Sequence, residues 1–87
     1  MSAEEIQSKL HTLIQPYVED KSLLDSVKPE TDLLQDLHIN SAHLVDIILD
    51  AEDAFGIEID DDSAEQMLTV GAAVEVIQAA IIAQKSD

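Results

Sequence analysis

The chain has 87 residues, enough for one small domain, and carries 19 acidic residues against four lysines and no arginine, a formal net charge of −15. This acidity disfavours nucleic acid and anionic membranes as partners and favours basic protein surfaces. Cysteine is absent, which rules out disulfides and thiolate metal sites, and no apolar stretch approaches the roughly 20 residues that cross a bilayer. We expect a monomeric cytoplasmic protein, because no secretion signal is apparent at the N-terminus.

Residues 2–18 are predicted to form the first helix. Ser2 and Glu5 have the spacing of a capping box, in which each side chain bonds the other residue's backbone. Pro16 should end or bend this helix, since proline lacks the N–H that the helix needs. The apolar side chains at helical spacing are Ile6, Leu10, Leu13, Ile14, Tyr17 and Val18.

A long connection should follow, from about residue 20 to residue 40. Its centre, residues 28–32, contains Pro29 and is predicted to be a turn. Loops of this length are uncommon in small domains unless they are functional. Because this one is rich in leucine, we expect it to be pinned onto the core; its apolar residues are Leu23, Leu24, Val27, Leu33, Leu34 and Leu37.

The second helix is predicted over residues 41–55, with Gly56 as a left-handed cap. Its apolar stripe is Leu44, Ile48, Ala51 and Phe55, at steps of three and four.

Two interpretations of the helix start remain open. In the first, Asn40 or Ser41 serves only as the N-cap. Alternatively, an anionic group attached to the Ser41 hydroxyl would be stabilised there by unpaired backbone N–H groups and the positive end of the helix dipole.

A loop at residues 58–61, a short helix near residues 62–67 and a final helix complete the chain. Thr69 is the expected cap of the last helix, whose apolar stripe is Val70, Ala73, Val74, Ile77 and Ile81. The chain contains only two aromatic residues, so its core must be aliphatic, which suits packed helices. We predict a single all-α domain over residues 1–87, a small antiparallel four-helix bundle of three main helices and one short helix with a long first loop.

Acidic residues gather along the second helix. Asp46, Asp50 and Asp53 lie three or four residues apart and therefore share one side. They could serve only to keep the protein soluble, but their clustering behind Ser41 favours a docking face for basic partners. The expected docking residues are Ala42, Val45, Asp46, Leu49, Asp50, Glu52 and Asp53.

Catalytic patterns are missing from the sequence. His11, His38 and His43 are scattered, and Asp60, Asp61 and Asp62 lack the spacing of a calcium loop. No glycine-rich phosphate loop or nucleophilic triad can be recognised. We therefore expect neither an enzyme nor a metal site.

Several segments together resemble the acyl carrier protein family over nearly the full length of the chain: residues 36–41 (DLHINS), 45–47 (VDI), 52–59 (EDAFGIEI), 64–65 (AE) and 68–71 (LTVG). The resemblance implies that Ser41 receives 4′-phosphopantetheine from coenzyme A through a phosphopantetheinyl transferase. The arm would carry an acyl chain as a thioester between enzymes of fatty-acid, specialised lipid or polyketide biosynthesis. From helical periodicity alone, we expect the acyl chain to be sheltered between Leu44, Ile48, Val74 and Ile77.

Three positions depart from the family pattern. Asn40 replaces the usual Asp before the serine, Ala42 the usual Leu after it, and His38 the usual Gly three residues before it. These changes indicate a specialised carrier. The other interpretations are an aminoacyl or peptidyl carrier, and an unmodified acidic helical adaptor that binds a basic partner.

Overall fold

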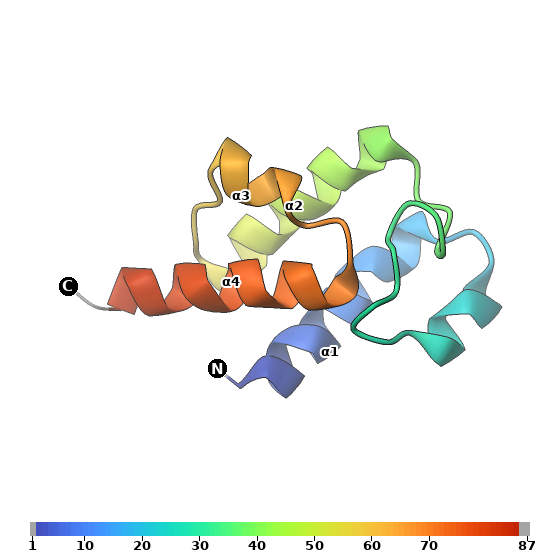
Figure 1. Ribbon diagram of the computed structural model, residues 1–87, viewed down its shortest axis with the longest axis horizontal. Helices are drawn as coiled ribbons and strands as arrows, with labels where there is room; N and C mark the ends of the chain where they lie inside the picture. Colours follow the sequence, from blue (N-terminus) through green and yellow to red (C-terminus); the bar gives the residue numbers. More distant parts are fainter. Residues whose placement is uncertain (1, 86–87) are drawn as a thin grey trace.

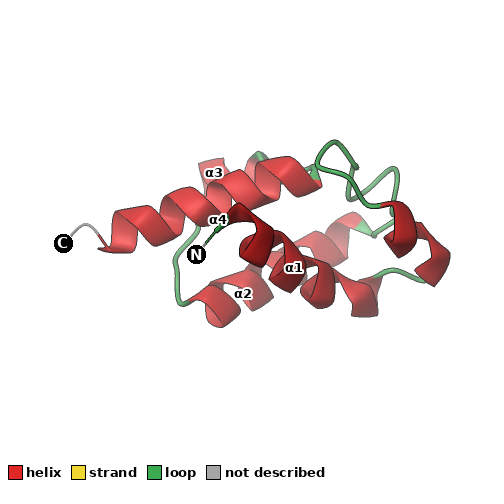
Figure 2. Ribbon diagram, turned by 90° about the horizontal axis from the view of Figure 1, so that it is seen from below, coloured by secondary structure: helices red, strands yellow, loops and turns green. Residues whose placement is uncertain are grey.

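Three long helices and one short helix form the bundle (Figure 1). The computed structural model describes residues 2–85, and the long helices are α1 (Ala3–Ile14), α2 (Ser41–Phe55) and α4 (Val70–Lys85), with α3 (Asp61–Glu65) between the last two. Helix α1 packs against both α2 and α4 and runs in the opposite direction to them (Figures 1 and 2). The predicted all-α bundle is confirmed. No helix within residues 2–85 is long and apolar enough to span a membrane.

The helix ends are set by local contacts, as predicted. The Glu5 N–H donates to Ser2 Oγ at 3.2 Å, and the Ser2 N–H donates to Glu5 Oε1 at 3.3 Å, which completes the capping box. Pro16 lies in a 3₁₀ turn, η1 (Gln15–Tyr17), directly after α1. Gly56 takes a φ of 63°, the left-handed conformation that ends α2.

The core is aliphatic and draws on every long helix. Its α2 contribution differs from the prediction, because the most deeply buried residues are Ile47 and Ala51, both 0 % exposed. Leu44, Ile48 and Phe55 are only partly buried and pack against that core. The prediction omitted Ile47. Spacing alone could not separate neighbouring apolar positions on a helix with a broad apolar face.

The connection between α1 and α2 is more ordered than a loop. It contains a second 3₁₀ segment, η2 (Lys21–Ser26), which the sequence analysis did not predict. The predicted turn is present, since the Thr31 N–H donates to the Lys28 carbonyl at 3.0 Å. Leu33 and Leu37 are buried at 1 % and 2 % exposure, so the connection is pinned to the core as expected.

Backbone hydrogen bonds join this connection to the start of α4. The Leu33 N–H donates to the Leu68 carbonyl at 2.9 Å, and the Val70 N–H donates to the Thr31 carbonyl at 3.0 Å. The Gly71 N–H donates to the Pro29 carbonyl at 2.7 Å. The N–H groups of Val70 and Gly71 are donors that a helix start leaves unpaired, and the connection accepts from both. The Thr69 hydroxyl accepts from the next one, the Ala72 N–H, at 3.1 Å, as predicted for the cap.

Candidate functional site at the start of helix α2

Ser41 is the first residue of α2, and its side chain is exposed. The cap is Asn40, whose Oδ1 accepts from the Ala42 N–H at 2.9 Å. The helix start therefore does not depend on the Ser41 hydroxyl. The first turn of α2 also contains no acidic residue. A phosphate ester on Ser41 Oγ would thus face the positive end of the helix without a carboxylate beside it, so the residues present fit a phosphopantetheine arm.

The segment that leads to Ser41 is held by alternating buried residues. Leu37 and Ile39 are 2 % and 3 % exposed, and the Ile39 N–H donates to the Leu33 carbonyl at 3.2 Å. His38 lies between them with a φ of 55°, in the left-handed region. Glycine would adopt this φ without steric cost. Histidine is among the side chains that enter this region more often than most, so His38 can adopt it as well.

The outer side of α2 carries most of the predicted docking residues. Val45 and Leu49 are 58 % and 56 % exposed. The other exposed members of the set are Ala42, Asp46, Asp50 and Asp53. The structure therefore brings small apolar side chains and carboxylates together on the face next to Ser41.

Glu52 differs from the other predicted docking residues. Its side chain is half-buried, and Glu52 Oε2 accepts from the Ile59 N–H at 2.8 Å. The Glu52 carbonyl also accepts from the Ile57 N–H at 3.0 Å. Glu52 thus holds the segment that leaves α2, and its side chain is less exposed than those of the other predicted docking residues.

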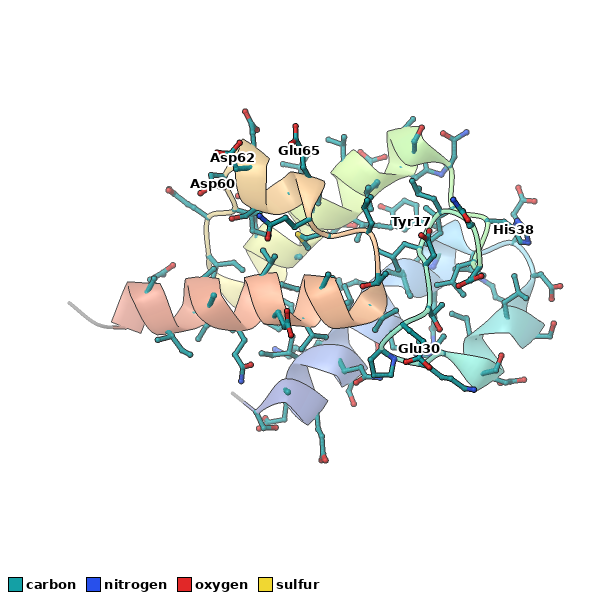
Figure 3. The ribbon with its side chains drawn as sticks, viewed as in Figure 1. Tyr17, Glu30, His38, Asp60, Asp62 and Glu65 are labelled. Carbon is teal, nitrogen blue, oxygen red and sulfur yellow. The ribbon has the colours of Figure 1, made fainter. Side chains whose placement is uncertain are left out.

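Tyr17 adds a contact that sequence reasoning missed. The prediction placed it in the apolar stripe of the first helix, but its hydroxyl donates to Asp50 Oδ2 at 2.9 Å. Its ring lies 5.4 Å from the His43 ring, tilted by 49°. Tyr17 thus lies where the end of α1 passes α2 (Figure 3). The pKa of the Tyr17 phenol is raised, chiefly by the hydrogen bond to Asp50 and then by burial and by the charges of Asp50 and Asp46.

One of the acidic residues that follow α2, Asp60, stabilises the start of a helix. Asp60 is the N-cap of α3, and its Oδ1 accepts from the Ser63 N–H at 2.7 Å. Hydrogen bonding to the backbone N–H and the hydroxyl of Ser63 lowers the pKa of Asp60. Asp62 and Glu65 lie on the outer side of α3 (Figure 3), where they extend the acidic surface beyond α2. Helix α3 is shorter than predicted, because the chain turns after Glu65.

The residues that were predicted to shelter an acyl chain are packed together. Ile77 and Val74 are 0 % and 7 % exposed, and Leu44 and Ile48 pack against the same cluster. An open groove of about 420 Å³ lies elsewhere, between α4 and the segment from residue 58 to α3. Its apolar lining includes Ile59, Val76 and Ala80.

No family model matches the sequence. Among curated relatives, the acyl carrier protein of Lactobacillus acidophilus is 47% identical over 79 residues, which cover 90% of this chain and 95% of the relative. That of Rubrobacter xylanophilus is 39% identical and covers 88% and 93%. The solved acyl carrier protein of Enterococcus faecalis superposes with a TM-score of 0.75 at 34% identity, covering 92% of this chain and 99% of that chain. Because both sequence identity and fold extend over nearly the whole length of these relatives, the chain belongs to the acyl carrier protein family.

Proposed function

We propose that Ser41 carries the 4′-phosphopantetheine arm and that the protein shuttles acyl groups, bound to the arm as thioesters, between biosynthetic enzymes of the cytoplasm. The observation that carries this proposal is the position of Ser41: exposed, first in α2, and free of the capping role that Asn40 fulfils. The arm supplies the thiol that accepts the acyl group. The protein's own residues bind partners and present the arm, so we do not assign it a catalytic residue.

The docking face is the exposed side of α2 next to Ser41. Asp46, Asp50 and Asp53 provide charge for a basic patch on the modifying transferase or on an acyl-transferring enzyme. Val45 and Leu49 add apolar contact area between these acids. A small and mainly charged interface forms quickly and releases quickly, as a shuttle requires.

The cargo has one packing constraint. If the acyl chain is sheltered between Leu44, Ile48, Val74 and Ile77, these side chains must move apart, because they belong to or border the packed core. Aliphatic side chains can rearrange in this way at a modest energetic cost when total volume is recovered by the guest. Carrier proteins loaded with acyl chains of increasing length should therefore show their first chemical-shift changes at these four residues.

Intact-mass measurement tests the attachment site. Wild-type protein, Ser41→Ala and the control Ser26→Ala are incubated with coenzyme A and a panel of phosphopantetheinyl transferases. Ser26→Ala removes an exposed hydroxyl from the last residue of η2. Wild type and Ser26→Ala should gain one phosphopantetheine group, and Ser41→Ala should gain none. Because Asn40 and Ala42 alter the usual recognition sequence, only part of the panel should be active. A wild-type protein that no transferase modifies would favour the unmodified adaptor instead.

A further inference from the structure

We propose that Tyr17 is a positioning residue of the docking face: its hydroxyl holds the Asp50 carboxylate in the orientation that a cationic group on a partner enzyme meets. This inference rests on the proposed function, because it concerns the encounter between α2 and an enzyme that acts at Ser41. It assigns a recognition role to a residue that comes from outside α2.

The local structure explains how Tyr17 reaches α2. Helix α1 ends at Ile14, and Pro16 directs the chain into η1. Val18, which follows, is 1 % exposed and anchors the turn in the core. Tyr17 is therefore held between two constrained residues, and its side chain extends over His43 to Asp50.

Asp50 needs such a partner because of its neighbours. Asp46 lies one turn before it and Asp53 one turn after it, and like charges at these spacings repel. An exposed carboxylate in this setting samples several rotamers. The 2.9 Å hydrogen bond from Tyr17 selects one of them and leaves Asp50 Oδ1 available to a partner. Ordering this side chain in advance removes part of the entropy that docking would otherwise cost.

The chemical nature of the donor also matters. A lysine at position 17 would orient Asp50 but would cancel its charge and weaken the attraction to a basic surface. The phenol orients the carboxylate and leaves the charge unchanged. The ordinary tyrosine pKa of about 10 already keeps the phenol neutral at physiological pH, and the contact raises the pKa of Tyr17 further. Tyr17 thus fixes the orientation of the Asp50 carboxylate without weakening the electrostatic attraction between α2 and a basic partner.

Transferase kinetics separate this role from a purely structural one. Tyr17→Phe keeps the ring and removes the hydroxyl. Thr12→Val is the control, because it removes a hydroxyl that bonds only within α1, to the Ser8 carbonyl at 3.2 Å. For Tyr17→Phe we expect the KM for the apo-protein to rise about two- to tenfold, with kcat unchanged. This range corresponds to the entropic cost of ordering one side chain, Asp50, on docking. Thr12→Val should match wild type.

A double variant shows whether Tyr17 acts through Asp50. In an Asp50→Ala background, Tyr17→Phe should cause no further rise in KM, because the positioned carboxylate is already absent. An unchanged KM for Tyr17→Phe in otherwise wild-type protein, or an equal rise in both backgrounds, would overturn the inference and leave the proposed function intact. A wild-type protein that no transferase modifies would overturn both.

The contact itself can be measured without any partner. Tyr17 is the only tyrosine, and the chain has no tryptophan, so tyrosinate absorbance reports its titration alone. Asp50→Ala should lower the pKa of Tyr17 toward the ordinary value of about 10. Far-UV circular dichroism over the same pH range checks that the helices persist. An identical titration in wild type and Asp50→Ala would show that the hydrogen bond does not form in solution.

Discussion

Replacement of Gly71 by alanine tests how the long connection is attached to α4. A Cβ at this position would lie 2.9 Å from the Pro29 carbonyl oxygen and 3.2 Å from the Pro29 Cβ. The nearest atom belongs to the backbone of a turn that two hydrogen bonds close, from the Lys28 N–H to Thr31 Oγ1 at 2.8 Å and from the Thr31 N–H to the Lys28 carbonyl at 3.0 Å. The clash therefore cannot be relieved by a rotamer change alone.

The size of the effect follows from two opposing contributions. Overpacking against atoms that cannot move freely costs about 1–3 kcal/mol, and alanine recovers up to about 1 kcal/mol through its higher helix propensity. We expect a net loss of about 1–2 kcal/mol in the free energy of unfolding. For a domain of this size, that loss lowers the Tm by about 4–16 °C.

Thermal and urea unfolding, followed by far-UV circular dichroism, measure this loss. Gly56→Ala is the matched control, because a Cβ there meets no atom within 4 Å and the cost arises only from the positive φ of 63°. That cost should be about 1–2 kcal/mol. Pro29 replacement by alanine should not rescue Gly71→Ala, since the obstructing carbonyl oxygen remains. A Gly71→Ala protein as stable as wild type would refute the close approach of the connection to α4.

Three further predictions concern the core, the charge and the docking face. Ile47→Ala should lower the free energy of unfolding by about 2–5 kcal/mol, and Leu44→Ala by less, because Ile47 is completely buried and Leu44 only partly. Urea denaturation that gives the reverse order would contradict our assignment of the core. Moderate salt or magnesium should raise the Tm, because a net charge of −15 on a small bundle is self-repulsive and salt screens it; a Tm that falls or stays constant in a salt series would contradict this. Asp46→Lys should slow association with a transferase in stopped-flow measurements, and high salt should reduce the difference from wild type. Asp25→Lys, the same charge change on η2, is the control, and an equal slowing by it would remove α2 as the docking face.

Much of the local structure could be predicted because it depends on residues close together in the chain. The capping box of Ser2 and Glu5, the cap of Thr69 and the left-handed Gly56 each involve backbone groups within a few positions. The position of Ser41 at a helix start was predicted for the same reason. His38 shows that a change of residue type need not change the backbone. It departs from the family's glycine, yet it adopts the left-handed φ of 55° that glycine would favour.

The sequence by itself thus determined the three long helices, their caps and the place of Ser41, because helical periodicity and capping are short-range properties. Only the tertiary structure decided which carboxylates remain available to a partner. Glu52 and Asp50 are both acids of α2, but one bonds the Ile59 N–H seven residues later and the other the Tyr17 hydroxyl 33 residues earlier. Such contacts depend on how α1 and the segment after α2 are packed against the helix. Spacing within α2 carries no information about that packing, since tertiary contacts link residues that are distant in the chain.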